Sequence, residues 1–473
     1  MSTTDLQDLL SLLNHSISIV NGKVVVNDQE GLRATIHHLA EVSALETGSR
    51  QGLARYLTRS IALALGIVPA SIQDLYAARG RGDVPATFTV PAMNLRALSF
   101  EAAKSAFRAA IPLDAATLIF EIARSEMNYT DQRPSEYVTS ILAAAINEGY
   151  RGPVFIQGDH FQVSAKKYPV NPDAEIQAIR ELIDEAIQAG FYNIDIDTST
   201  MVDLSKPSVP EQQTLNVELS ALLTAFIRSK EPKGVTISVG GEIGEVGGHN
   251  STEEELRAYM DGYNTKLQKL VPGTVGISKI SIQTGTSHGG VVLPDGSIAK
   301  VSVDFNTLRN LSSISRKDYG LGGAVQHGAS TLPEDAFGKF VENQTIEIHL
   351  ATNFMNMLFD RMPVELRDQM YTYLDEKHAS DRKSDMTNEQ FYYKTRKNAV
   401  GPFKKQTWNL PANKKAEIGK IWEEQFSKLF KLLGLTGTRD YVEKTVQPVI
   451  VKPDLNFYLG GAVSAEEVSD LAD

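Results

Sequence analysis

The sequence has 473 residues, of which 42% are hydrophobic and 22% are charged, and both values are ordinary for a globular protein. A net charge of −11 argues against broad attraction to nucleic acids or anionic membranes, and the absence of Cys excludes disulfides and thiolate metal sites. No apolar run approaches the roughly 20 residues needed to cross a bilayer, and the acidic N-terminal segment is unlike a secretory signal, so we expect a cytoplasmic protein.

Residues 1–84 are expected to form a helical N-terminal extension. The stretch "GLRATIHHLAEVSALETGSRQGLARYLTRSIALAL" carries apolar residues at mixed spacings of three and four, which is typical of packed helices. The segment "ARGRGDVPA" that follows is rich in Gly and charge and is interpreted as a linker.

Residues 85–365 show a different pattern, in which short apolar strands alternate with helices. The strands do not alternate cleanly between apolar and polar residues, so both faces of the sheet are expected to be covered. Eight strands with intervening helices predict an α/β fold, a (β/α)8 TIM barrel with helical N- and C-terminal extensions, better than an open sheet. The expected strands are 87–93, 116–123, 153–158, 192–197, 234–242, 278–285, 323–327 and 345–350.

Residues 366–473 are rich in Lys, Glu and aromatic side chains. They are expected to form a helical C-terminal extension that serves as a cap or an oligomer contact, and a homodimer or higher homo-oligomer is predicted. Their basic cluster is interpreted as a solvated face, because charge runs of this kind ordinarily face water.

Polar side chains recur where the predicted strands end, which is where barrel enzymes place their active sites. Imidazoles and a carboxylate are the ligands that Zn²⁺ takes when thiolates are absent, and three protein ligands leave a position for substrate oxygen. We therefore expect a Zn²⁺ site, which Co²⁺ or Mn²⁺ could also occupy. Its expected ligands are His160, His288 and His327, with Glu242 as a fourth or alternate ligand and with Asp159 directly beside His160.

Three glycine-containing segments follow these strand ends. The segment "GGEIGEVGG", residues 240–248, lacks the spacing of nucleotide-binding loops and is interpreted as a mobile loop or a tight turn. The small residues of "HGG" (288–290) and "HGAS" (327–330) could present backbone N–H groups to an anion, or could simply form turns. Gly289, Gly328 and Ser330 are the candidate phosphate-binding residues.

In their order along the chain, these motifs resemble those of the class II, zinc-dependent fructose- and tagatose-bisphosphate aldolases. The resemblance covers roughly residues 86–360. It rests on "GDH" (158–160), "IDTS" (196–199), "GEIGEVGG" (241–248), "GTSHGG" (285–290) and "HGAS" (327–330).

The resemblance implies a zinc barrel that makes or breaks a carbon–carbon bond of a sugar or sugar phosphate. It implies that His160, His288 and His327 bind Zn²⁺, that Glu242 serves an alternate metal position, and that Gly289 and Ser330 lie on phosphate-binding loops. It also implies that Asn94 contacts substrate and that Asp159 carries the proton at the bond that reacts. Chemically, cleavage leaves an enediolate whose negative charge Zn²⁺ can disperse, and a carboxylate can take the hydroxyl proton.

The chain departs from the family pattern at two places. The loop that usually supplies an acidic proton donor continues here with His249, so His249 or Glu245 is expected to fill that role. The last strand, "EIHLAT", carries Glu347 and His349 instead of the family's substrate-holding residues. Because Glu347 would repel phosphate if it faced the site, a substrate with one phosphate or none is an alternative to a bisphosphate.

Two other functions fit the same motifs. A ketose C4-epimerase would use the same metal to break and reclose one bond and would release no cleavage products. A non-catalytic, aldolase-associated subunit would retain the metal but would need a partner chain for activity. The Asp159 carboxylate and the three His residues argue for a catalytic protein.

Overall fold

The computed structural model describes residues 3–244, 248–285, 293 and 303–460. Within these ranges, eight parallel strands close into a barrel in chain order, and the last strand pairs with the first through Glu347–Val90 and its neighbours. The predicted α/β barrel is therefore confirmed. Its strands are β4 (Val90–Asn94), β5 (Ile119–Ala123), β6 (Gly152–Gln162), β7 (Asn193–Asp197), β8 (Ser238–Glu242), β9 (Lys279–Ile282), β10 (Ala324–Gln326) and β11 (Glu347–Leu350).

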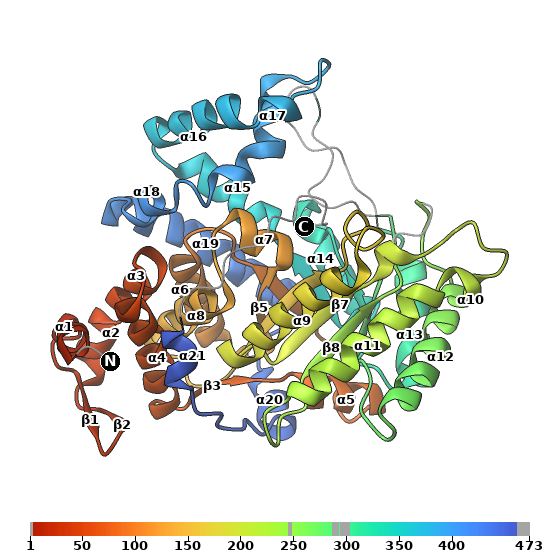
Figure 1. Cartoon of the computed structure of the whole chain (residues 1–473), viewed down its shortest axis with the longest axis horizontal. Coiled ribbons are helices and arrows are strands. Elements are labelled where there is room, and N and C mark those ends of the chain that lie inside the picture. The colour runs from red at the N-terminus through yellow and green to blue at the C-terminus, as the bar shows by residue number, and fades with distance from the viewer. Residues whose placement is uncertain (1–2, 245–247, 286–292, 294–302, 461–473) are drawn as a thin grey trace.

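Helices connect the strands and cover the outside of the barrel (Figure 1). They carry the long apolar faces that the sequence pattern predicted, and they bury them against the strands. The helices between the strands are α6 (Ser99–Ala110), α7 (Arg124–Tyr129), α8 (Pro134–Glu148), α9 (Pro172–Ala189), α10 (Val209–Gln212), α11 (Thr214–Lys230), α12 (Glu253–Leu270), α13 (Phe305–Tyr319) and α14 (Phe337–Glu342).

The N-terminal extension contains strands as well as helices. β1 (Ile17–Val20) and β2 (Lys23–Val26) form a hairpin whose turn, Asn21–Gly22, has positive φ at both residues. An Asn-Gly pair between apolar strands favours such a turn, so this hairpin had a signal in the sequence that the helical prediction overlooked. The helices of this extension are α1 (Thr3–Leu12), α2 (Gln29–Thr35), α3 (His37–Leu45), α4 (Ser49–Ala64) and α5 (Gln73–Arg81).

A third strand of the extension, β3 (Ile67–Ala70), joins the barrel sheet. It pairs in parallel with the first half of β6, from Gly152 to Phe155, while β7 pairs with β6 from Gln157 onward. The Asn193 side chain bridges the point where β7 takes over from β3, because its amide donates to the carbonyls of Ala70 (3.1 Å) and Ile156 (3.0 Å). The extension therefore supplies part of the barrel's hydrogen bonding.

The C-terminal extension is helical, as expected. Its longest helix, α19, packs on α6 and α15, and the helices α16 and α17 lie at the top of the view in Figure 1. The helix α15 (Thr352–Arg361) follows the last barrel strand, and the helices of the C-terminal extension are α16 (Val364–Lys377), α17 (Asn388–Thr395), α18 (Lys404–Trp408), α19 (Ala412–Leu432), α20 (Arg439–Thr445) and α21 (Leu455–Leu459). Among the described residues, no helix has both the length and the apolar character to cross a bilayer.

A buried ionic contact ties both extensions to the barrel. Glu136 on α8 accepts a hydrogen bond from Lys404 at the start of α18 (2.8 Å), and Arg55 on α4 lies 3.8 Å from the same carboxylate oxygen. All three residues are buried, so each charge depends on the others for compensation. The barrel helix α8 therefore contacts both ends of the chain.

Trp422 on α19 tests how much the C-terminal extension stabilises the barrel. Its ring is buried, its Nε1 donates to the Phe354 carbonyl (3.0 Å), and the neighbouring Phe426 packs against Phe354 at 4.8 Å between ring centroids. We expect Trp422→Ala to lower the free energy of unfolding by about 3–5 kcal/mol, measured by urea denaturation followed by circular dichroism. Trp408→Ala, which removes a partly exposed ring, serves as the control and should cost clearly less. A free energy of unfolding that is unchanged by Trp422→Ala would contradict a structural role for α19.

Candidate active site

A bulge in β6 explains why a carboxylate and an imidazole stand side by side at its end. Neighbouring residues of a regular strand point to opposite faces. Here the pairing with β7 shifts between Gly158 and Phe161, and His160 has a φ of +39°. Asp159 and His160 are both buried and both contact residues from other barrel strands. The strained backbone therefore brings two adjacent side chains into one site.

Gly158 is required beside this bulge. A Cβ atom at Gly158 would lie 2.4 Å from Cζ of Phe161, whose buried ring occupies the space next to the strand. A side chain at this position would therefore displace Phe161 or the bulge itself.

The bulge places His160 against three of the other strand ends. His160 Nε2 lies 2.9 Å from Nδ1 of His327, and His160 Nδ1 lies 3.2 Å from Oδ2 of Asp197 and 3.4 Å from Oε2 of Glu242. One ligand atom from each of His160, Glu242 and His327 falls within 4.8 Å of the others. The structure thus brings together three of the four residues expected to bind metal, and the fourth, His288, lies outside the described residues.

The charges in this cluster depend on one another. Burial opposes the charged imidazole of His160, but Asp159 and Glu242 together with the hydrogen bond to Asp197 raise its pKa well above the usual range. Burial and the nearby Asp197 carboxylate raise the pKa of Glu242 to about 8. The positive charge on His160 therefore compensates the neighbouring carboxylates, which could not all be ionised without a cation close by.

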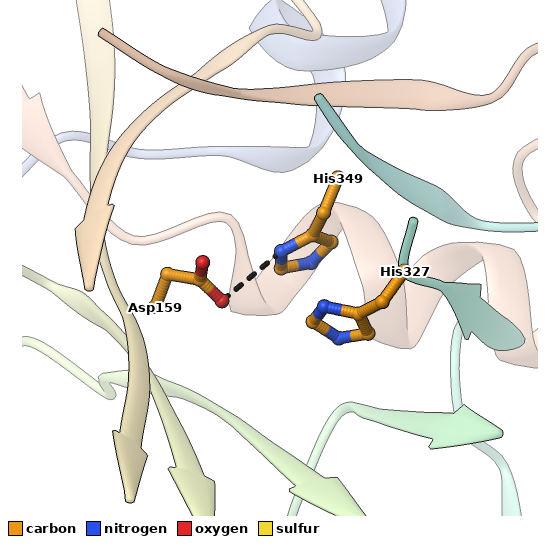
Figure 2. A group of neighbouring side chains, drawn as sticks. All are labelled: Asp159, His327 and His349. Carbon is orange, nitrogen blue, oxygen red and sulfur yellow. Dashed lines mark ion pairs between the residues drawn. The ribbon is translucent and has the colours of Figure 1, made fainter. Parts of the chain in front are cut away.

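A second group of side chains lies beside the first and includes His349, which the sequence analysis had not assigned to the site. Figure 2 shows Asp159 on β6 and His349 on β11 facing His327, which directly follows β10. His349 Nδ1 lies 3.1 Å from Oδ1 of Asp159, and its ring centroid lies 3.9 Å from that of His327. Burial opposes the charge of Asp159, but His160 and His349 outweigh it and hold the pKa of Asp159 well below its usual range.

A small cavity opens beside Asp159, and several of the predicted substrate-binding residues line it. Asn94 donates from Nδ2 to Oδ2 of Asp159 (3.0 Å) and to Oε2 of Glu126 (2.7 Å). Ser330 accepts a hydrogen bond from the backbone N–H of Ala351 (2.6 Å). The lining residues are Asn94, Arg96, Asp159, His160, His327, Gly328, Ser330, Thr331, His349, Ala351 and Thr352.

His249 lies apart from this cavity. About half of its side chain is exposed (52%), and its Nε2 lies 3.2 Å from Oε1 of Glu255 near the start of α12. The structure therefore does not bring His249 together with Asp159. The other expected loop residues, Glu245 and Gly289, lie outside the described residues.

The barrel interior below the cavity holds a network of charges that the sequence analysis missed. Lys279 Nζ donates to Oε1 of Gln157 (2.7 Å) and forms ion pairs with Asp195 (2.9 Å) and Glu347. Lys279 and His349 outweigh burial and lower the pKa of Glu347 to about 2, whereas burial and the nearby Asp159 raise the pKa of Glu121 to about 8. The negative charge of Glu347 is thus compensated inside the barrel by Lys279, and Glu347 is absent from the cavity lining.

Gly240 makes room for this network. A Cβ at Gly240 would lie 2.3 Å from Oδ1 of Asp195 and 2.9 Å from Cε of Lys279. The sequence did contain a signal for this network. Its charged residues lie in strands that are covered on both faces, and a buried charge needs a partner.

Comparison with known proteins identifies the family. A family model described as fructose-bisphosphate aldolase class-II matches residues 85–407. The chain belongs to this family. The resemblance carried by the short motifs is therefore confirmed, and the matched range runs from before β4 into α18. No curated protein sequence matches the chain.

Several solved structures are similar to this chain at low sequence identity. A structure described as a probable tagatose 6 phosphate kinase from Sinorhizobium meliloti 1021 has a TM-score of 0.50 at 15% identity, covering 78% of this chain and 97% of that chain. The fructose-bisphosphate aldolase of Campylobacter jejuni has a TM-score of 0.46 at 16% identity, covering 79% and 96%. The YdjI aldolase of Escherichia coli K12 has a TM-score of 0.45 at 14% identity, covering 78% and 99%.

Class II aldolases depend on a metal ion, and the side chains around His160 fit one. The donor set combines two imidazoles with a carboxylate, which suits a divalent transition metal. The two facing imidazole nitrogens are 2.9 Å apart, and two nitrogens on one tetrahedral Zn²⁺ ion would be about 3.3 Å apart. A small outward shift of the rings would therefore admit an ion.

The bulge can be tested through Gly158. We expect Gly158→Ala to lower the free energy of unfolding by about 1–3 kcal/mol, because its Cβ must displace the buried Phe161 ring. Thermal unfolding monitored by calorimetry measures the loss. Gly338→Ala, at a helical position with open space around the new Cβ, is the matched control and should be neutral or slightly stabilising. An unchanged melting temperature for Gly158→Ala would contradict the packing argument.

Proposed function

We propose that this protein is a metal-dependent aldolase that cleaves or forms a ketose carrying one or two phosphates. The observation that carries the proposal is the convergence of Asp159, His160 and His327 at the carboxyl ends of strands in the region matched by the class II aldolase family. Barrel enzymes assemble their chemistry at this end.

We assign the metal to His160 and His327, with Glu242 as a further or alternate ligand and His288 as the remaining imidazole. Zn²⁺ is the first choice for this donor set, and Co²⁺ or Mn²⁺ could replace it. When bound, the ion would polarise the substrate carbonyl and stabilise the negative charge that develops on the ketone fragment.

We assign the proton transfer to Asp159. Its low pKa keeps the carboxylate ionised near neutral pH, so it can accept a proton. In the cleavage direction the substrate hydroxyl gives its proton to Asp159, its oxygen becomes the aldehyde carbonyl, and the electron pair of the carbon–carbon bond passes to the ketone fragment. In the synthesis direction Asp159 returns the proton. Protonation of the ketone fragment is assigned to the loop that contains Glu245 and His249.

We assign the phosphate to the loops that contain Gly289, Gly328 and Ser330, and direct substrate contact to Asn94. Gly328 and Ser330 line the same cavity as Asp159, and the cationic side chain of Arg96 lines it as well. The Arg96 guanidinium is paired with the buried carboxylate of Glu126, so a phosphate in this cavity would share that cation with Glu126. The absence of Glu347 from the lining is compatible with a phosphate, because its carboxylate is paired with Lys279.

A panel of ketoses, with two, one or no phosphates, tests the function of the purified protein. We expect cleavage to aldehyde and ketone products with at least one phosphorylated ketose. We also expect activity to be lost after dialysis against a chelator and restored by Zn²⁺. Interconversion of two ketoses without cleavage products would instead identify a C4-epimerase. Activity that appears only with a second, co-purifying chain would indicate a non-catalytic subunit.

Replacement of His327 tests the metal assignment. His327→Ala should reduce bound metal to well below one equivalent per chain, measured by atomic emission after gel filtration, because it removes an imidazole that faces His160. His378→Ala, which removes a partly exposed imidazole of the C-terminal extension, is the matched control and should retain the metal. Full metal retention by His327→Ala would remove this residue from the ligand set.

Replacement of Asp159 separates metal binding from catalysis. Asp159→Asn should retain the metal and lose turnover by about 10²- to 10⁴-fold, which is the usual contribution of a general base. Steady-state kinetics and metal analysis on the same preparation measure both quantities. Asp440→Asn, at an exposed position on α20, is the control and should behave like the unmodified protein. Unchanged turnover in Asp159→Asn would rule out the assigned role.

A further inference from the structure

The last residues of β6 are held by a neighbouring strand on one side only. β5 pairs with β6 as far as Ala123 and Asp159, and β5 ends there. After the shift in register at the bulge, β7 still pairs with β6 through Phe161 and Gln162. Among the described strands, none continues along the β5 side of β6 beyond Asp159. The backbone that follows the bulge therefore needs another partner on this side.

Arg124, the first residue after β5, supplies this partner through its side chain. Its Nη1 donates to the carbonyl of Gln162 (2.8 Å) and to Oε1 of Glu175 on α9 (2.6 Å). The same Glu175 oxygen accepts a hydrogen bond from the backbone N–H of Ser164 (2.8 Å). The ion pair therefore contacts the backbone on both sides of Val163, directly after the bulge.

The Arg124–Glu175 pair is buried, with exposed fractions of 4% and 2%. A buried ion pair is weak evidence for stability by itself, because the lost hydration of both charges offsets their attraction. It does impose a defined geometry, since the planar guanidinium presents its donors in a rigid fork. Nη2 of Arg124 also lies 3.4 Å from Oε2 of Glu175, so both ends of the carboxylate face the guanidinium. The pair thus fixes the backbone that it contacts.

The strand end that this pair contacts carries the candidate reacting groups. Asp159 and His160 precede Gln162 by three and two residues, and His160 has a φ of +39°. Such a backbone conformation persists only where the surrounding structure holds it. A carboxylate that transfers a proton must keep a defined orientation toward the substrate, and a misplacement of about 1 Å can cost about 100-fold in rate.

We propose that Arg124 and Glu175 are positioning residues, which clamp the end of β6 so that Asp159 and His160 keep the orientation that the reaction requires. This inference rests on the proposed aldolase function, because it assigns the clamp to the same reaction. Neither residue of the clamp lines the cavity beside Asp159, so both act through the backbone of β6.

A double variant, Arg124→Met with Glu175→Gln, tests the clamp without leaving one charge buried alone. The amide introduced by Glu175→Gln can still accept the Ser164 N–H, so the contact that is lost is the one to Gln162. The matched control is Arg133→Met with Glu185→Gln, which removes an ion pair between the start of α8 and the same helix α9 (3.3 Å). Glu175→Gln alone is a milder second variant and should act in the same direction as the double variant.

Hydrogen–deuterium exchange on the metal-free protein measures the clamp directly. We expect amide exchange at residues 159–163 to be about tenfold faster in the clamp variant, because a lost hydrogen bond from a charged group weakens the folded segment by roughly that factor. The control variant should exchange like the unmodified protein in this segment. Unchanged exchange in the clamp variant would overturn the proposal.

Steady-state kinetics separates positioning from a general loss of stability. We expect kcat of the clamp variant to fall about 100-fold, with KM for the ketose phosphate changed less than about threefold. The control variant should keep the kcat of the unmodified protein. An equal loss of kcat in the control, or an unchanged kcat in the clamp variant, would contradict a positioning role.

The two measurements distinguish failure of this inference from failure of the proposed function. If the unmodified protein cleaves no ketose, the aldolase function fails. The exchange experiment needs neither substrate nor metal, so it still decides whether the Arg124–Glu175 pair holds the end of β6.

Discussion

The interior of this barrel is organised by the need to compensate buried carboxylates. Glu121, Asp159, Asp195 and Glu347 are all buried, and ionised carboxylates at such positions are unstable without cations or hydrogen-bond donors. Lys279 and His349 supply the positive charge from within the chain. The metal site proposed beside His160 lies directly above this network, so an ion there would add to a charge balance that the protein already maintains.

A second constraint is the backbone at the end of β6, which carries both Asp159 and His160. The bulge in β6 turns two consecutive residues into the same site, which no regular strand could do. The backbone strain at His160 is maintained by the imidazole contacts to Asp197 and His327, and by the Phe161 ring packed against Gly158. The site therefore depends as much on an irregular backbone as on the identity of its side chains.

The sequence predicted the architecture well, because short strand segments alternate with helical segments eight times along the chain. It also directed attention to the residues at the strand ends, of which Asn94, Asp159, His160 and His327 do lie together. It could not reveal the bulge, since Gly158 marks such a site only weakly. The contacts of His349 were equally hidden, because they depend on how four strands are brought together in space.

Some missed features did have a signal. In "EIHL", residues two apart share a face, so Glu347 and His349 had to point to the same side of β11. Lys279 at the start of "KISI" likewise placed a charge inside a strand expected to be buried on both faces. If these charges had been interpreted as paired groups inside the barrel, the sequence would have predicted the buried charge network. It would not have predicted which residues pair with each other.

The strand β3 has a consequence for how the chain matures. It belongs to the first seventy residues, yet its partner edge on β6 begins only at Gly152. During synthesis this short strand leaves the ribosome well before its partner, and its backbone groups must remain hydrated until β6 emerges. A shortened gene that starts at β4 would leave the lower edge of β6 without the hydrogen bonds that β3 provides, and an unpaired edge of this kind can pair with another chain.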